Sequence, residues 1–193
     1  NPFERTPEAV RLASAPTSAQ DSVYVSLAAD GGKVLNRINH PHLKTIYPPV
    51  AQAAFATAHL LAPWSIHGLR ILLLLCDVAS LLLLIRLLGR LGLPPAMTAV
   101  WWWNPLLVKE IYNSAHMDIL LVPLLLGAIL AVSSRRQLTA SLLLALAVGV
   151  KVWPVILLPL FLRSRGAGWQ RAGVAVVLFT AACLMLYSPL AGR

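Results

Sequence analysis

The sequence contains few charged residues and little cysteine. Charged residues make up 12% of its 193 residues and hydrophobic residues 58%, whereas soluble domains are about 25% charged. An ordinary buried core cannot account for this excess of apolar residues, but a lipid-facing surface can, so the composition excludes a soluble domain. The two cysteines, Cys76 and Cys183, lie in apolar runs without the spacing of a metal site, which favours buried free thiols.

Nucleotide-binding and hydrolase motifs are also absent from the sequence. It has no glycine-rich phosphate loop, no Walker pattern and no ordered Ser/His/Asp set, so a soluble nucleotide-sugar or ATP-dependent enzyme is unsupported. The net charge is +9, but arginines such as Arg86, Arg90, Arg135 and Arg136 occupy short breaks between apolar runs. This is the pattern of cytoplasmic loops under the positive-inside rule, and no nucleic-acid partner is expected.

The chain starts without Met, and its first residues lack the basic start and apolar core of a signal peptide. We therefore expect an N-terminally truncated fragment. Residues 1–47 are polar and contain several prolines and glycines, which predicts part of an extracytoplasmic loop, with one or two helical turns at residues 8–12. Residues 48–193 are predicted to form a transmembrane helical bundle of about five to six membrane segments.

The apolar runs predict an all-α integral membrane protein with a multi-pass helical bundle. Pro48 and Pro49 favour a helix start, but the helix over residues 50–62 is short for a full crossing and is expected to be re-entrant or interfacial. A helix long enough to span is predicted over residues 69–88. Further helical segments, separated by short breaks, are predicted at residues 96–103, 106–112, 117–132, 138–150, 155–162 and 174–186.

The same charge pattern predicts which breaks share a side of the membrane. If the arginine-bearing breaks face the cytoplasm, residues 104–118 lie on the extracytoplasmic side, and so does the break at Lys151. Trp101, Trp102 and Trp103 then fit an aromatic belt at the outer interface.

A cluster of polar residues follows the break at Asn104 and Pro105: Lys109, Glu110, Asn113, His116 and Asp118. A charge at membrane depth costs about 2.5–3.5 kcal/mol, so each charged group here requires a structural or functional role that offsets this cost. On a regular α-helix, Lys109 and Asn113 would be i,i+4 neighbours, as would Glu110 and Ser114. Two interpretations stay open: a functional site, or a solvated loop in which Asp118 caps the next helix.

Other polar residues also interrupt apolar surroundings. Lys151 separates two apolar half-helices, and it is either a cation that receives an anion such as phosphate or a lysine that extends its ammonium to the interface. Asp77 lies inside an apolar helix, where we expect a buried carboxyl hydrogen-bonded to a neighbouring helix. His40 and His42 are separated by Pro41 and have no nearby Cys or carboxylate, so no metal site is predicted.

Several short motifs, taken in order, resemble those of bacterial multi-pass mannosyltransferase-like membrane proteins of the C-type glycosyltransferase class. Residues 1–3 (NPF) resemble an Asn-Pro-aromatic element of their first extracytoplasmic loop, and residues 37–52 (RINHPHLKTIYPPVAQ) resemble the end of that loop. Residues 103–106 (WNPL) and 115–118 (AHMD) are similar to a Trp-Asn-Pro and Gly-His-x-Asp segment, with Ala115 where Gly is usual. Residues 151–159 (KVWPVILLP) are similar to a Lys-x-x-Pro and Leu-Pro pair.

The resemblance implies a C-type glycosyltransferase of the bacterial inner membrane with its active site on the extracytoplasmic side. The donor would be a polyprenyl-phosphate hexose, with mannose as the expected sugar, and the acceptor a lipid-linked or cell-envelope glycan. No cofactor is implied, and dependence on a divalent metal is left open. The family's main acidic residue would precede Asn1, so we expect the fragment alone to be inactive.

The resemblance also implies roles for individual residues. The expected catalytic residues within this chain are His116, Asp118 and Glu110. The expected substrate-binding residues are Lys151 and Arg37 for the phosphate, Asn113 in support, and His40 and Tyr47 on the loop side. Two other functions stay open: a non-enzymatic transporter or flippase, which also uses broken helices and intramembrane charge, and a scaffold subunit of an envelope complex.

Overall fold

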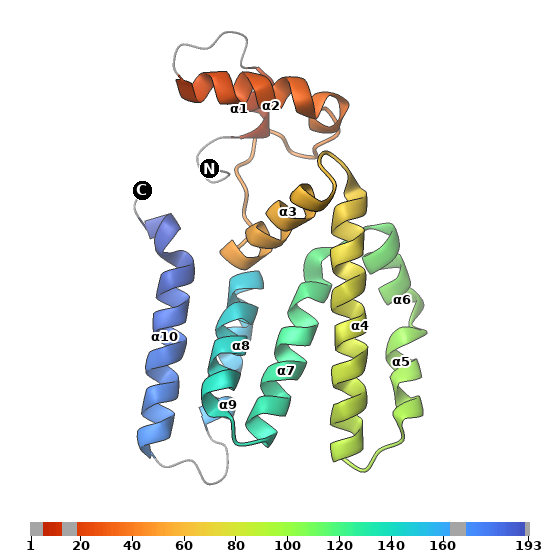
Figure 1. Cartoon of the computed structure of the whole chain (residues 1–193), viewed down its shortest axis with the longest axis vertical. Coiled ribbons are helices and arrows are strands. Elements are labelled where there is room, and N and C mark those ends of the chain that lie inside the picture. Colours follow the sequence, from red (N-terminus) through yellow and green to blue (C-terminus); the bar gives the residue numbers. More distant parts are fainter. Residues whose placement is uncertain (1–5, 13–18, 163–168, 192–193) are drawn as a thin grey trace. The chain divides into compact units, whose positions relative to one another are not determined.

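The computed structural model describes residues 6–12, 19–162 and 169–191 (Figure 1). Every regular element in these ranges is helical and none is a strand, which confirms the predicted all-α class. The chain divides into two compact units, Asn1–Ile46 and Tyr47–Arg193.

The first unit contains two helices, α1 (Pro7–Arg11) and α2 (Ala19–Leu35). The hydroxyl of Thr6 caps α1 by accepting a hydrogen bond from the backbone N–H of Ala9 at 3.2 Å. The predicted helical turns at residues 8–12 are therefore confirmed, and so is the loop predicted over residues 36–47, but the prediction of loop over residues 19–35 was wrong. Residues 19–30 contain no Pro or Gly, and the backbone leaves the helical region inside α2 only at Gly32, where φ is 40°.

The second unit contains most of the apolar helices. The breaks predicted at Asn104 and Lys151 are both present, and each predicted helical segment is helical over nearly all of its length. The elements are α3 (Pro49–Leu61), α4 (Ile66–Arg90), η1 (Pro95–Thr98), α5 (Ala99–Trp102), α6 (Pro105–Leu107), η2 (Val108–Asn113), η3 (Met117–Leu120), α7 (Leu121–Ser133), α8 (Gln137–Val150), η4 (Trp153–Leu157), α9 (Leu158–Leu162) and α10 (Trp169–Ala191).

Some of these helices are long and apolar enough to cross a membrane. Within the described ranges they are α4 and the segment Trp169–Ser188 of α10. The pair Pro105–Asn113 and Met117–Ser133, bent by 102°, would add a third span if it forms one broken crossing. The helix α8 and the segment Trp153–Leu162 are apolar but shorter.

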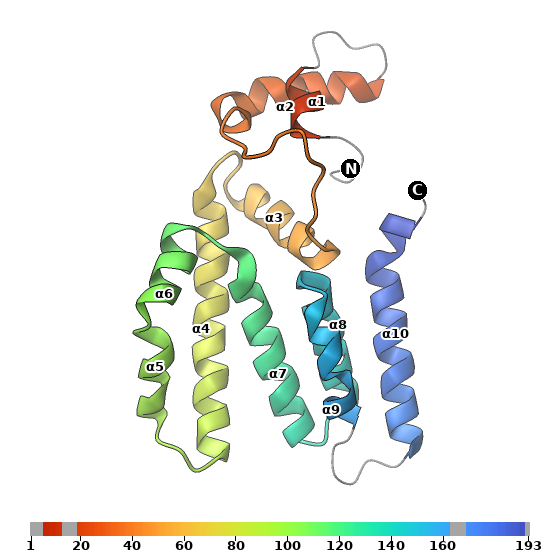
Figure 2. The same ribbon diagram turned by 180° about the vertical axis from the view of Figure 1, so that it is seen from behind.

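The helices α4, α7, α8 and α10 lie side by side and place their breaks at two opposite ends of the unit (Figures 1 and 2). At one end, Lys151 follows α8 and contacts Asp118 of η3; we call it the Lys151 end. At the other end lie arginines from the last turn of α4, from the α7–α8 turn and from the first turns of α10. We call it the arginine end. The arginine-bearing breaks share one end, as predicted, and the membrane face that each end occupies stays a prediction.

Two glycines allow α3 to lie across the Lys151 ends of α4 and α8. A Cβ atom at Gly68 of α4 would lie 2.1 Å from the backbone oxygen of Ala58 in α3. A Cβ atom at Gly149 of α8 would lie 2.4 Å from Cγ2 of Val50 in α3. The backbone oxygen of Ala58 cannot move aside, so the α3–α4 contact requires glycine at position 68, whereas at Gly149 the side chain of Val50 packs directly on the backbone of α8.

Buried polar contacts connect α4 to its neighbours. The side chain of Asp77 is buried; its Oδ1 accepts a hydrogen bond from Trp101 Nε1 at 3.1 Å, and its Oδ2 accepts one from the Tyr112 hydroxyl at 2.6 Å. The expectation of a buried, hydrogen-bonded carboxyl at this position is confirmed. At the arginine end, the Arg90 guanidinium donates to the backbone oxygen of Leu130 and to the hydroxyls of Ser133 and Ser134, which satisfies the end of α7.

We predict that Gly68→Ala and Gly89→Ala have opposite effects, although both glycines lie in α4. At Gly68 the atom in the way is a backbone oxygen that cannot rotate aside, so the variant should lose about 1–3 kcal/mol of unfolding free energy. At Gly89 no atom lies within 4 Å of the new Cβ, so alanine should gain up to about 1 kcal/mol from helix propensity. Thermal unfolding of the full-length protein in detergent measures both, and equal shifts would disprove the close α3–α4 contact.

Candidate functional site

A widened helical turn precedes the polar cluster. Asn104 accepts a hydrogen bond from the Leu106 N–H at 2.9 Å, and Pro105 opens α6, so the Asn-Pro pair starts a new helix. The chain then turns as a π-helix over η2, where the Ser114 N–H donates to the Lys109 oxygen at 3.0 Å. The expected α-helical i,i+4 spacing of Lys109 with Asn113 and of Glu110 with Ser114 was therefore wrong, because the turn holds an extra residue.

The widened turn brings Glu110 to His116. The backbone N–H of His116 donates to the Glu110 backbone oxygen at 2.9 Å, and His116 Nε2 lies 3.2 Å from Glu110 Oε2. The ammonium of Lys109 lies 3.3 Å from the other carboxylate oxygen, Oε1. A carboxylate on one ring nitrogen fixes the orientation of an imidazole and leaves its other nitrogen for a ligand.

Lys151 and Asp118 form the contact that joins two separate helix breaks. The helix α8 ends at Val150, and Lys151 continues in extended conformation with φ −146° and ψ 143°. Its ammonium lies 2.6 Å from Oδ1 of Asp118, which stands in the first turn of η3. Both side chains remain accessible, at 43% and 56% of their surface, so an incoming anion could reach the lysine.

The polar groups at this end can serve one kind of chemistry together. The ammonium of Lys151 can bind a phosphate oxygen, since charge-assisted hydrogen bonds to phosphate are strong. The imidazole of His116, held by Glu110, can hydrogen-bond a sugar or acceptor hydroxyl. A cation for a phosphate beside a hydrogen-bonding group for a hydroxyl is the arrangement that group transfer from a phosphorylated donor needs.

Comparison with protein families identifies the chain at this point. Residues 43–164 match the family model described as alpha-(1->6)-mannopyranosyltransferase, N-terminal domain, of the MptA/B family. The chain belongs to this mannosyltransferase family. The matched segment contains both helix breaks and all three carboxylate contacts of the Lys151 end, and the mannosyltransferase resemblance inferred from the sequence motifs is confirmed.

Two curated relatives carry related descriptions. The chain is 31% identical over 117 residues to GPI mannosyltransferase 1 of Gibberella zeae, across 58% of this chain and 23% of that protein. It is 32% identical over 114 residues to the GPI alpha-1,4-mannosyltransferase I catalytic subunit of Danio rerio, across 56% of this chain and 29% of that protein. The aligned part therefore spans about a quarter of these relatives. No solved structure matches the chain.

The backbone at Ala115 explains one departure from the motif of the resembling mannosyltransferases. Ala115 has a φ of 52°, in the left-handed region that glycine adopts without cost and other residues adopt at a cost of about 1–2 kcal/mol. The glycine usual before His-x-Asp is thus a requirement of the turn between η2 and η3. In this mannosyltransferase chain, alanine adopts the same conformation with strain.

Arg70 is a cation of the Lys151 end that the sequence reasoning missed. It lies in the first turns of α4, and its Nη2 is 3.5 Å from the backbone oxygen of Asn113, a long and weak contact. Its Nε is buried without a hydrogen-bond partner. Arg70 could have been found from the sequence, since it lies two turns before Asp77 in an apolar helix. The predicted topology places the start of this helix beside the polar cluster.

The remaining predicted site residues are not part of this cluster of contacts. Arg37 and His40 belong to the first unit, where the His40 ring lies 6.0 Å from the His42 ring, centroid to centroid. Tyr47 packs edge-on against Phe55 of α3 at 5.2 Å, and Asn113 offers its backbone oxygen to Arg70. In the described part of the chain, no group of three or more His, Cys, Asp or Glu side chains could hold a metal ion. Substrate contact by Arg37, His40, Tyr47 and Asn113 stays a prediction.

We predict that Ala115→Gly stabilises the protein, by about 0.5–1 kcal/mol once the greater freedom of the unfolded glycine chain is subtracted from the relieved strain. The matched control is Ala53→Gly, at an exposed helical position of α3, which should instead cost about 1 kcal/mol. Chemical or thermal unfolding of the full-length protein measures both. Destabilisation by Ala115→Gly equal to that of Ala53→Gly would contradict the left-handed turn.

Proposed function

We propose that the full-length protein transfers a mannosyl group from a polyprenyl-phosphate mannose to a lipid-linked or cell-envelope glycan acceptor, at the extracytoplasmic face of the bacterial inner membrane. The observation that carries this proposal is the contact between Lys151 and Asp118 at 2.6 Å. It presents an accessible cation at the end of an apolar helix, within the segment that matches the mannosyltransferase family. The proposal concerns the whole protein, of which this chain supplies the cluster described above.

The donor is the part of the reaction that this site fits most directly. Its polyprenyl tail would stay among the apolar helices, and its phosphate would lie at the interface, at the depth of a helix end. Lys151 would then bind a phosphate oxygen, either in place of Asp118 or together with it. Arg70, whose guanidinium has only one weak contact, would supply a second cation.

The chemical step is a displacement at the anomeric carbon of the donor mannose. The acceptor oxygen forms a bond to C1, the C1–O bond to phosphate breaks, and polyprenyl phosphate leaves with the electron pair. Lys151 stabilises the negative charge that develops on the leaving phosphate. His116, oriented by Glu110, holds the hydroxyl, and the hydroxyl proton passes to a carboxylate base.

We predict that Lys151→Ala and Asp118→Asn each slow transfer roughly 10- to 100-fold in the full-length protein, because each removes a charge-assisted hydrogen bond worth about 1.5–3 kcal/mol. Folding stability should change by less than about 1 kcal/mol, since the pair is accessible to solvent. The measurement is transfer of labelled mannose from a synthetic polyprenyl-phosphate donor by purified protein in detergent.

The control for this experiment is Lys33→Ala, which removes an exposed lysine of the first unit and should leave the rate unchanged. Near-normal transfer in Lys151→Ala would remove this residue from the site. If the purified wild-type protein transfers no mannose but moves the lipid across vesicle membranes, the transporter alternative replaces the proposal.

We also predict opposite accessibility for the two ends of the second unit. In a background with Cys76→Ala and Cys183→Ala, Asn113→Cys should react with a membrane-impermeant thiol reagent added outside intact cells. Arg135→Cys, at the arginine end, should react only after the membrane is permeabilised, as the positive-inside rule requires. The reverse pattern would place the Lys151 end in the cytoplasm and overturn the proposed extracytoplasmic site.

A further inference from the structure

The arginine end contains cations without carboxylates. No Asp or Glu occurs in residues 78–109 or in residues 119–193. Arg90 is engaged by the end of α7, but Arg135, Arg136 and Arg171 form no ion pair or side-chain hydrogen bond with any residue that the structure describes. Their charges are therefore left for an external anion to balance.

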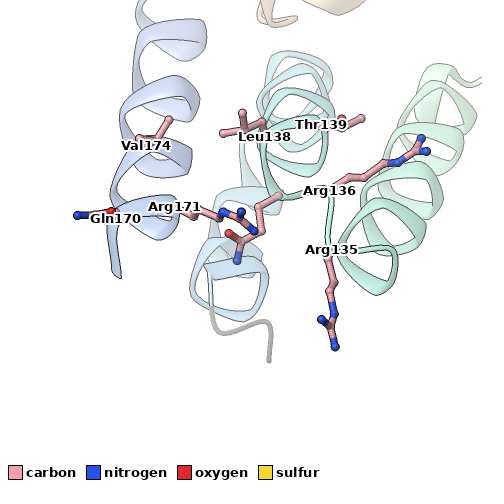
Figure 3. A pocket seen from close by; sticks show the side chains of 8 residues that line it. Arg135, Arg136, Leu138, Thr139, Gln170, Arg171 and Val174 are labelled. Atoms are coloured by element: carbon pink, nitrogen blue, oxygen red, sulfur yellow. The ribbon is translucent and has the colours of Figure 1, made fainter. Parts of the chain in front are cut away.

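A cavity of about 550 Å³ lies among these arginines, between the first turns of α8 and α10 (Figure 3). This is within the usual size range of small-ligand sites, about 300–1,000 Å³. In Figure 3 the Arg171 side chain extends from α10 toward α8, and Arg135 and Arg136 leave the α7–α8 turn in other directions. The residues that line the cavity are Arg135, Arg136, Gln137, Leu138, Thr139, Gln170, Arg171 and Val174.

The N-terminus of α8 borders the same cavity. The residue before α8, Arg136, makes no capping hydrogen bond with its side chain, and the first turn of α8 contains no acidic residue. The described residues of α10 that line the cavity include no acidic residue either. Because the N-terminus of α8 carries a partial positive charge from the helix dipole, it adds to the arginines and favours an anion here.

The cavity also has an apolar wall, which narrows the class of anion. Leu138 of α8 is 47% exposed, and Val174 of α10 is 55% exposed, although both belong to apolar helices. Figure 3 shows their side chains directed toward each other across the space between the two helices. An inorganic anion would leave this wall uncovered, whereas an acyl chain beside the helices would cover it.

We propose that this cavity binds the headgroup of an anionic phospholipid, with the phosphate between Arg171 and the start of α8 and with Arg136 at the edge of the cavity. An acyl chain lies along Leu138 and Val174. Under the positive-inside rule this end faces the cytoplasmic leaflet. Basic pockets between membrane helices on that side bind the headgroups of anionic lipids. The proposal does not depend on mannosyl transfer, since the cavity is at the opposite end from Lys151.

Specific binding differs from the general attraction of a basic loop to a membrane surface. A diffuse attraction depends on the number of positive charges near the membrane and not on where they lie. A built site depends on Arg136 and Arg171 and not on a lysine elsewhere. Lys109, an exposed cation at the Lys151 end, therefore supplies a control that removes a positive charge at the opposite end from the cavity.

The test uses the full-length protein, stripped of lipid in a neutral detergent and followed by thermal unfolding. Phosphatidylglycerol at about ten times its dissociation constant should raise the melting temperature by roughly 2–4 °C. Phosphatidylcholine and inorganic phosphate should each raise it much less. The double variant Arg136→Gln/Arg171→Gln should lose the shift, and Lys109→Gln should keep it.

Several outcomes would overturn the proposal. An equal shift of the melting temperature with phosphatidylcholine would show that the headgroup charge does not determine binding. An equal shift with inorganic phosphate would show an anion site that does not require lipid. A shift retained in the double variant, or lost in Lys109→Gln, would remove the cavity as the cause. If the double variant does not fold, native mass spectrometry of the wild-type protein decides: it should retain phosphatidylglycerol in preference to phosphatidylcholine, and equal retention would refute the site.

Discussion

The ion pair between Lys151 and Asp118 joins the two helix breaks that meet at the Lys151 end. Each partner stands at a place where a helix stops being regular: Lys151 after α8 and Asp118 at the start of η3. A continuous helix would keep such residues apart or place their charges beside lipid, at a cost of several kcal/mol. The two breaks instead deliver the charges to the same end of the bundle, where they meet each other and remain open to a ligand.

The contacts that fix the bundle and the contacts that meet a ligand are different sets. Asp77 is buried and bound to Trp101 and Tyr112, so it holds α4 against α5 and η2 and has no accessible surface for substrate. By contrast, the pairs Lys151–Asp118 and His116–Glu110 are partly exposed. Buried polar groups are costly to unpair, while exposed ones are not. The frame can thus stay fixed while the exposed pairs exchange partners.

Much of this structure could be predicted from the apolar runs and the prolines, because lipid-facing helices and their breaks are local properties of the sequence. The helix α2 was missed because Gly31 and Gly32 suggested a break, although only Gly32 departs from helical geometry. The extra residue in η2 was also missed, since no residue type marks a π-turn. Pairings such as Lys151 with Asp118 depend on tertiary packing, and spacing alone could place them only at the same end. The mannosyl donor was inferred from the family resemblance, since no single residue specifies a sugar.

The helix α8 has cations beyond both of its ends, and the two ends are not equivalent. Lys151 follows the C-terminus, where exposed backbone oxygens attract a positive charge, whereas Arg136 precedes the N-terminus, where backbone N–H groups repel it. An anion that neutralises the arginines would therefore stabilise the N-terminal end of α8, whereas the C-terminal end already has a cation beside it.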